Sequence, residues 1–465
     1  MGGPQVDGPP DAPVRHRWSE STRFLPRVVI QPTQRFMNSN ISGAIVMLAA
    51  AVLALIWANT PWGSVYERLW DTEVQLSVGG FDAVSGLTLR QWVTDGAMAF
   101  FFYVVALEIK REMVSGDLRD PRAAALPIIG ALGGMVVPAL IYLAFNAGGP
   151  GEHGWGVPMA TDIAFAVAVI TAAGRRVPTG ARLFLLSLAI VDDLGAIAVI
   201  AIFYTAGLSL TWLLAAAATM VTGYVLQRIS VRALPPYAVL AVVCWFALHE
   251  SGVHATIAGV AFGFLTPAWS FHDPHRFPRH AKAIVAPIEQ VFADEVLSYR
   301  EYAVTQSAVR DMRRLAVETE APLDRLENAL TPWVTFVVVP LFAFANAGLV
   351  LPDDALTAWL TDDVALGVAL GLVLGKTIGV FGASWLAIRT RVGVLPAGTS
   401  WRHMFGVAVT AGVGFTVALF VGELAFSDPH LGESAKLGIF LGSAVAGVLG
   451  FLLLRTGPVP RDADD

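Results

Sequence analysis

Charged side chains are scarce in this sequence of 465 residues, because Asp, Glu, Lys and Arg make up only 15% of it whereas hydrophobic residues make up 55%. Mean hydropathy is +0.61. A soluble domain carries roughly one charged residue in four, so these values exclude an ordinary soluble protein. Cysteine is almost absent too, and the single Cys244 excludes an internal disulfide bond.

Long apolar runs are what the sequence does contain. Windows of about 19 residues predict about twelve spans long enough to cross a hydrocarbon core of about 30 Å. They centre near residues 49, 102, 134, 165, 194, 219, 242, 261, 339, 376, 412 and 446. Since backbone groups must be paired within lipid and the runs are long, we expect helices rather than barrel strands. The fold class is therefore an all-α integral membrane protein.

Positive charge falls on one side of these spans. With alternate loops on opposite sides, all but four of the 31 Lys and Arg residues lie on the side of the two termini. The exceptions are Arg68, Arg90 and Lys436 on the other side and Lys376 within a span. This asymmetry predicts that both termini are cytoplasmic.

Segments outside the spans divide the chain. Residues 1–37 lack an apolar signal sequence and predict a disordered cytoplasmic tail, and residues 456–465 form a second cytoplasmic tail. Eight spans occupy 38–269 and four occupy 329–455. At about 60–90, EVQLSV and GLTL flank two glycines and predict an external β-hairpin. Residues 270–328 predict a cytoplasmic helical insertion.

Four ionisable residues lie at membrane depth. Asp192 and Asp193 fall halfway along LFLLSLAIVDDLGAIAVIAIFY, Lys376 holds the matching place in its span, and Asp162 lies nearer one face. Together they oppose insertion by on the order of 10 kcal/mol, which favours a functional role. A buried ion pair that only joins helices is the alternative.

Helix geometry gives the two adjacent acids different roles, since neighbouring residues point about 100° apart. One is expected to line a water-filled funnel while the other reaches Lys376. Two carboxylates and one ammonium leave a residual charge of one negative unit, which a monovalent cation or a proton neutralises. Carboxylate oxygens bind both, so cation and proton compete for one site.

Two spans are interrupted where polar ligands would be useful. GVPMATDIAF contains Pro158 and Thr161 beside Asp162, and VAVTAGVGFTVALF contains two glycines between two threonines. Paired broken spans indicate a transporter binding site, where Asp162 would balance positive helix ends and Lys376 negative ones. Close helix packing is the competing explanation for the glycines.

Seven stretches resemble the NhaA-type Na⁺/H⁺ antiporter family. In order, they are LEIKREM (107–113), ATDIAFA (160–166), LAIVDDLGAI (188–197), SGVHATIAG (251–259), VPLFAFANAG (339–348), LGKTIG (374–379) and AGVGFTVALF (411–420). The resemblance covers roughly residues 36–455. It implies about 12 transmembrane helices with inverted-topology repeats and two broken, crossing helices.

The resemblance also implies a function. It indicates a non-enzymatic, electrogenic secondary transporter of a bacterial cytoplasmic (inner) membrane that extrudes Na⁺, and also Li⁺, in exchange for external H⁺ by alternating access. Neither a cofactor nor a nucleic acid partner is expected, and the lipid bilayer surrounds a homodimer joined through the hairpin. Asp192 and Asp193 match the ion- and proton-binding pair, with Asp193 the more direct Na⁺ ligand. Thr161 and Asp162 match residues at the helix crossing, and Lys376 matches the partner of Asp192.

Three further residues match positions linked to pH response in that family: Glu108, Glu327 and His254. Ordinary interfacial charge explains the two glutamates equally well, and a hydrogen-bonded cap explains the histidine. This chain has Asn328 and Thr331 where some relatives carry histidines, and its insertion is longer than the family's loop. The pH set point is therefore open.

Two functions of other classes remain as alternatives. An intramembrane aspartyl protease pairs acids from separate helices and needs a GxGD motif, which the sequence does not contain. A sodium-coupled solute symporter shares the broken-helix pattern but needs a polar substrate cavity as well.

Overall fold

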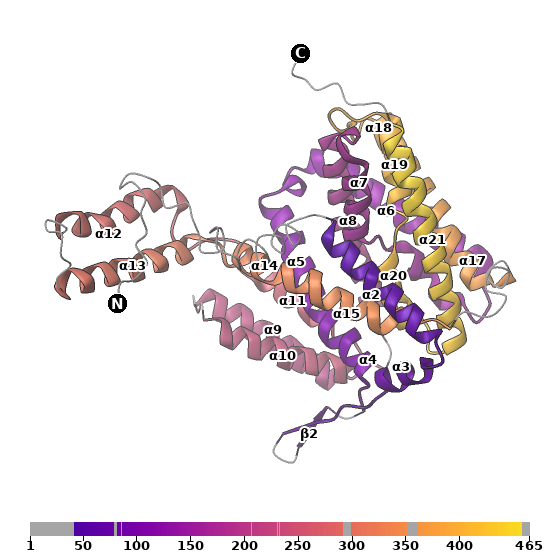
Figure 1. The fold of residues 1–465 in the computed structure, drawn as a ribbon, viewed down its shortest axis with the longest axis horizontal. Coiled ribbons are helices and arrows are strands. Elements are labelled where there is room, and N and C mark those ends of the chain that lie inside the picture. The colour runs from indigo at the N-terminus through magenta and orange to yellow at the C-terminus, as the bar shows by residue number, and fades with distance from the viewer. Residues whose placement is uncertain are drawn as a thin grey trace.

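The computed structural model describes residues 41–457, without 79, 80, 85, 206, 230, 232, 292–298 and 351–360. The predicted tails at 1–37 and 456–465 lie outside these residues, apart from 456 and 457. Within the described part, nine helical segments are long and apolar enough to cross a membrane, or eleven with two bent pairs included. The protein is thus a multi-pass helical membrane protein (Figure 1).

The first half of the chain forms an outer hairpin and the first group of helices. The elements are α2 (Ser42–Ala58), α3 (Gly63–Trp70), β1 (Leu76–Val78), β2 (Phe81–Val84), α4 (Leu89–Gln91), the π-helix η3 (Trp92–Ala97), α5 (Met98–Val114), η4 (Asp117–Arg119), α6 (Pro121–Asn146), η5 (Glu152–Met159), α7 (Ile163–Ala173), η6 (Gly174–Arg176), α8 (Thr179–Phe203), α9 (Leu210–Arg228), α10 (Leu234–Ser251) and α11 (Ile257–Leu265).

The second half contains the insertion and the remaining membrane helices. The elements are η7 (Pro274–Arg276), α12 (Phe277–Val291), α13 (Tyr299–Thr319), α14 (Pro322–Trp333), the π-helix η8 (Val334–Val338), α15 (Val339–Asn346), α17 (Asp363–Leu370), the π-helix η9 (Gly371–Gly375), α18 (Lys376–Arg389), α19 (Trp401–Thr410), α20 (Phe415–Ala425) and α21 (Pro429–Arg455).

The predicted count of about twelve spans is not confirmed, since nine to eleven segments qualify within the described residues. The span predicted near residue 261 is α11, a helix of only 9 residues. At 1.5 Å per residue it is too short to cross the hydrocarbon core by itself. Gly252 ends the preceding helix in a left-handed conformation (φ 81°), so the apolar run that continues into α11 is divided.

The hairpin is present, but its second strand differs from the prediction. β1 pairs with β2 in antiparallel register, with Val78 opposite Phe81, and GLTL contributes only an isolated bridge between Thr88 and Glu73. The reason is that Thr88 starts a helix: its hydroxyl accepts from the Gln91 N–H, and the Gln91 side chain accepts from the Thr88 N–H. This capping box ends the extended chain.

The insertion forms a helical hairpin in which α12 packs against α13, projecting from the membrane helices (Figure 1). Its predicted end at residue 328 is not tested, because α14 begins with polar turns before the apolar part of the next span. The helix of the next span already begins at Pro322, and Pro at a first helical position is favourable because its missing N–H would be unpaired there anyway. The middle of the predicted helical stretch, 292–298, lies outside the described residues.

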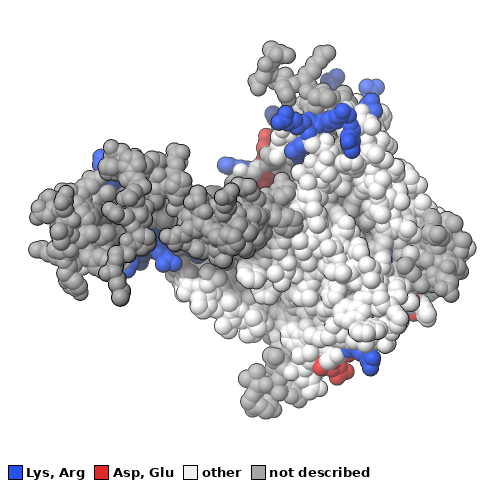
Figure 2. All heavy atoms as spheres, viewed as in Figure 1, with Lys and Arg blue, Asp and Glu red and all other residues white. Residues whose placement is uncertain are grey.

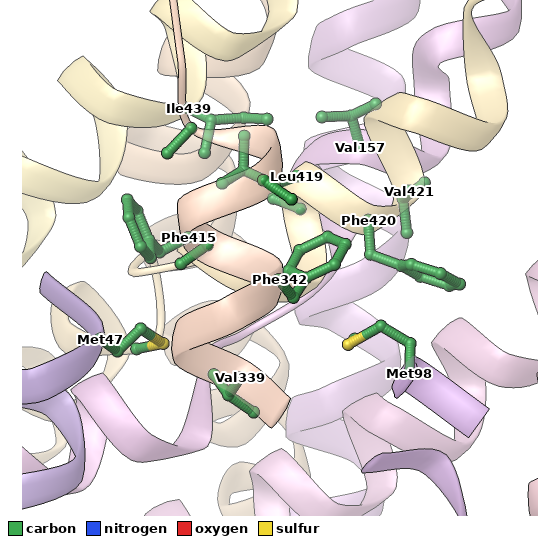
Figure 3. Packing of buried hydrophobic residues seen from close by; sticks show 14 of the residues in the cluster. Met47, Met98, Val157, Val339, Phe342, Phe415, Leu419, Phe420, Val421 and Ile439 are labelled. Atoms are coloured by element: carbon green, nitrogen blue, oxygen red, sulfur yellow. The ribbon is translucent and has the colours of Figure 1, made fainter. Parts of the chain in front are cut away.

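The core lies where α2, α5, α15, α20 and α21 meet (Figure 3). Phe342 and Phe420 are buried there with ring centroids 6.1 Å apart. Elsewhere, α6 and α18 touch backbone to backbone, because a Cβ at Gly379 would lie 2.1 Å from the Gly133 carbonyl oxygen. Only glycine permits this approach.

Candidate functional site

Helix α8 carries the two adjacent acids near the middle of its 25 residues. Asp192 and Asp193 are both buried, and their neighbours along the helix are apolar. The helix forms in this sequence because leucine, alanine and isoleucine dominate it and no proline interrupts it. The acids are therefore held at membrane depth on a continuous helix.

Lys376 lies directly beside the first of these acids. Its Nζ donates to Asp192 Oδ2 at 2.6 Å, and the side chains of both residues are 0% exposed. Lys376 is the first residue of α18, immediately after the π-helix η9. Gly134 of α6 allows α18 to pack closely beside the lysine, since a Cβ there would lie 2.7 Å from Val380 Cγ2. The structure thus contains the Lys376–Asp192 pair that the resemblance implies.

Asp193 differs from its neighbour because only Asp192 forms an ion pair with Lys376 among the described residues. The Oδ1 of Asp193 is buried without a hydrogen-bond partner within the described ranges, as is Asp192 Oδ1. The charged groups that interact with Asp193 are Asp192, Glu108, Asp162 and Lys376. A buried carboxylate oxygen without a partner is costly unless a proton or a cation occupies it. The Asp193 side chain is therefore available to a small cation or a proton.

The two predicted interruptions contact each other. Residues 160–162 are extended between η5 and α7, and the chain is also broken between α19 and α20. The Asp162 N–H donates to the Val413 carbonyl at 2.7 Å, and the Thr161 hydroxyl donates to the Ala411 carbonyl at 2.8 Å. Asp192 is a further neighbour of Thr161. The interruptions and the acidic pair therefore form one site.

Asp162 lies at the N-terminal ends of two helices. Its Oδ1 accepts from the Phe165 N–H of α7 at 3.1 Å, and its Oδ2 accepts from the Thr416 N–H of α20 at 3.1 Å and from the Thr416 hydroxyl. Both ends carry positive partial charge, so one carboxylate balances two helix dipoles as expected. Lys376 is also predicted to balance negative helix C-terminal ends. This remains a prediction, because the contact of its ammonium is with Asp192.

Replacing Asp162 by Ala should lower the free energy of unfolding by about 2 kcal/mol, since two helix caps of about 1 kcal/mol each are lost. Thermal unfolding in detergent measures the effect. The matched control is Asp428→Ala, which removes an exposed cap from the single helix α21. If Asp162→Ala lowers the free energy of unfolding no more than the control does, the second cap contributes nothing.

The charged groups near α5 form a second cluster. The Arg111 guanidinium donates to the Glu327 carboxylate and lies 3.9 Å from Glu112. Glu108 interacts electrostatically with Glu327 and also with Asp193 of the buried pair. Lys110 instead donates to the carbonyls that end α11, at 2.7 and 2.5 Å. Glu108 is therefore close enough to act on both the cluster and the acidic pair.

His254 makes a specific hydrogen bond in the turn before α11. Its Nε2 lies 2.7 Å from the Tyr204 carbonyl, which requires the proton on Nε2. Burial lowers the pKa of His254, while the Tyr204 hydrogen bond and the charge of Asp95 oppose this shift. The ring is thus uncharged in the folded protein at neutral pH. Its role in pH response remains a prediction.

This lowered pKa of His254 should make the fold less stable in acid. The unfolded chain takes up a proton near pH 6.5, whereas the folded chain resists it, so stability is present above that pH and is lost as pH falls below it. The loss is at most about 1.4 kcal/mol per pH unit. In thermal unfolding from pH 7 to 5.5, His254→Gln should show a weaker pH dependence. Exposed His430→Gln is the control, and an unchanged slope in His254→Gln would contradict the prediction.

Two polar residues of the site carry roles that sequence reasoning missed. The sequence places Thr416 beside the glycines of the second interrupted span but does not predict its contact with Asp162. Ser443 of α21, whose hydroxyl accepts from the Phe415 N–H at 3.2 Å, was not singled out at all. Nothing in the apolar sequence around Ser443 marks it, since serine is common in membrane helices.

No group of three or more His, Cys, Asp or Glu side chains in the described part of the chain is arranged to hold a metal ion.

Comparison with known proteins gives consistent matches over most of the chain. The model of the family described as Na⁺/H⁺ antiporter 1 matches residues 34–454. A protein of Rhodopirellula baltica named Na(+)/H(+) antiporter NhaA is 44% identical over 434 residues, which are 93% of this chain and 95% of that protein. Na(+)/H(+) antiporter NhaA 3 of Frankia alni is 44% identical over 93% of this chain and 89% of its own. Na(+)/H(+) antiporter NhaA of Acidithiobacillus ferrooxidans is 42% identical over 93% of this chain and 100% of its own.

Proposed function

The chain belongs to the Na⁺/H⁺ antiporter 1 family, and from this membership we propose that it exchanges Na⁺ for H⁺ across a bacterial membrane. The observation that carries the proposal is the arrangement of three buried groups: an ammonium bonded to one carboxylate, and a second carboxylate beside it with an unpartnered oxygen. Their formal charges leave one negative unit without a counter-ion.

The proposed cation site centres on Asp193. Na⁺ is a hard cation that prefers oxygen ligands, which the carboxylates of Asp193 and Asp192 supply, with Thr161 beside them. Asp162 holds the positive helix ends in place and so keeps the interrupted segments near the pair. Thr161, Asp162, Asp192, Asp193 and Lys376 are the proposed ion- and proton-binding residues.

Competition makes the site an exchanger. A carboxylate in a low-dielectric site binds a proton strongly, and the same oxygens cannot hold a proton and Na⁺ together. Lys376 adds a second proton-binding group coupled to Asp192 through their 2.6 Å contact. We propose that more than one proton enters for each Na⁺ that leaves, which makes the exchange electrogenic, and that Li⁺ is accepted as well.

In the remaining step of the proposed cycle, the site opens to one side of the membrane and then to the other. The interrupted helices contact each other at Asp162 and Val413, which is the place where half-helix ends meet in transporters of this architecture. We propose that they are inverted repeats that cross, and that the helices around them alternate between an inward and an outward opening. Glu108, Glu327 and His254 remain the candidates for setting the pH of activation.

Location and assembly follow from the proposed function. We propose that the protein lies in the cytoplasmic (inner) membrane with both termini cytoplasmic, where most Lys and Arg residues fall. We also propose a homodimer in which the hairpin of β1 and β2 contacts a second copy. Extrusion of Na⁺ would then contribute to sodium and pH homeostasis.

Everted membrane vesicles test the proposed exchange directly. A respiration-driven acidic interior is established, and its collapse after addition of NaCl, LiCl or KCl is followed across pH with a fluorescent dye. Na⁺ and Li⁺ should collapse the gradient whereas K⁺ should not. Failure of Na⁺ to do so at every pH tested, or Na⁺-driven uptake of a labelled organic solute, would overturn the assignment in favour of another transport function.

A further inference from the structure

Exposed arginines gather at one end of the membrane helices (Figure 2). Six of them, here named the arginine cap, come from four parts of the chain: η6, the end of α18 with the following loop, the start of α19 and the end of α21. The cap consists of Arg175, Arg176, Arg389, Arg391, Arg402 and Arg455. The cap is separate from the ion site at the middle of α8.

Contacts between these four parts hold the cap together. The Arg176 guanidinium donates to the Arg455 carbonyl, and Arg402 donates to the Thr456 carbonyl at 3.5 Å. The loop after α18 lies against the start of α8, because a Cβ at Gly180 would be 2.5 Å from the Ala397 carbonyl oxygen. The arginines therefore converge on one surface although they are distant in sequence.

Within the residues that the structure describes, the arginines of the cap form no ion pair with a carboxylate. The stretches 174–182, 389–402 and 455–457 contain no Asp or Glu. Arg90 and Arg111, by contrast, both have carboxylate partners. Like charges held on one surface repel each other and favour a bound anion.

Apolar side chains place the cap at the edge of the hydrocarbon. Leu386 lies three residues before Arg389 and is 56% exposed, Leu452 lies three before Arg455 and is 50% exposed, and Phe405 lies three after Arg402 and is 40% exposed. Residues three apart share a helix face. On α18, α19 and α21, an exposed arginine thus lies beyond an exposed apolar side chain toward the helix end. This places the arginines at the depth of lipid headgroups.

From this geometry we propose that the arginine cap binds the phosphate groups of anionic phospholipids and so holds together the ends of α7, α19 and α21. Guanidinium groups pair well with phosphate because their donors match its oxygens. The adjoining apolar side chains, which a dissolved anion would not contact, favour a lipid as the source of the phosphate. Since α7 and α19 are halves of the two interrupted helices, bound lipid stabilises the arrangement around the ion site.

Lipid titration of the purified full-length protein in a mild detergent tests the proposal. Phosphatidylglycerol should raise the melting temperature in a saturable manner, with less effect at high salt, and phosphatidylcholine should not. The triple variant Arg175→Gln, Arg389→Gln and Arg391→Gln should need at least about ten times more phosphatidylglycerol for half of the rise. Each single variant should show a smaller shift of the same sign, which keeps the test usable if the triple variant does not fold.

The matched control carries the same change in charge on the insertion, with Arg279→Gln, Arg310→Gln and Arg313→Gln, and should titrate like the unmodified protein. Equal responses to the two lipids, or unchanged half-saturation in the cap variants, would overturn the proposal. A rise of the same size with inorganic phosphate would identify a site for a dissolved anion instead. A last variant lacks residues 458–465, which include Asp462, Asp464 and Asp465. If this deletion lowers the melting temperature without lipid, and adding the cap substitutions lowers it no further, the acidic tail occupies the cap and the proposal is overturned.

Discussion

Replacing Asp193 by Asn should reduce sodium-dependent proton movement at least 100-fold. The amide keeps the size of the side chain but removes the titratable group, so protons and Na⁺ no longer compete for the unpartnered oxygen. Asp192→Asn should abolish exchange as well, because Lys376 then loses the carboxylate that it contacts at 2.6 Å. The measurement is the collapse of a pH gradient in everted vesicles on addition of Na⁺.

The control for these variants is Asp428→Asn, which changes an exposed acid at the start of α21 and should leave exchange intact. Expression and melting temperature of each variant establish that it is folded. Exchange that persists in a folded Asp192→Asn or Asp193→Asn variant would show that the buried pair is not the transport site.

Replacing Lys376 by Ala should lower the free energy of unfolding by about 3–5 kcal/mol, because Asp192 is left as a buried group without its partner. The effect on Na⁺ affinity should be smaller, since the ammonium is a competitor and not a ligand of the cation. Thermal unfolding in detergent and sodium titration of the residual activity measure the two quantities. The matched control is Lys436→Ala, which breaks a partly exposed 2.7 Å pair with Glu423 and should cost less than about 1 kcal/mol.

A double variant distinguishes loss of the ion pair from loss of packing. Adding Asp192→Asn to Lys376→Ala removes the unpaired charge and should restore part of the stability. An unaltered melting temperature in Lys376→Ala alone would show that the pair does not stabilise the helix packing.

The acidic pair, its lysine and the interrupted spans were visible in the sequence because polar residues are so costly in an apolar run. Asp192, Asp193 and Lys376 stand out for that reason, and the resemblance indicated which acid meets the lysine. The approach of Asp162 to a helix end was expected too, from the signature of a broken span beside an acid.

Other features depend on contacts that sequence patterns do not record. Apolar content alone predicted a full span near residue 261, yet Gly252 divides that run and leaves the short α11. The π-helix η9 before Lys376 has no sequence signal, because it differs from an α-helix only in its hydrogen-bond register. The sequence shows that Thr416 is polar. That it donates to Asp162 at the start of α20 depends on tertiary packing.

The backbone contact between Gly133 and Gly379 also limits how the transporter can move. Where the two backbones touch, no side chain lies between them that could be compressed, so we expect α6 and α18 to move as a single rigid block. Lys376 belongs to that block, whereas Asp192 belongs to α8. A rearrangement that separates their charges therefore has to move α8 relative to this block, and the Lys376–Asp192 distance would report it.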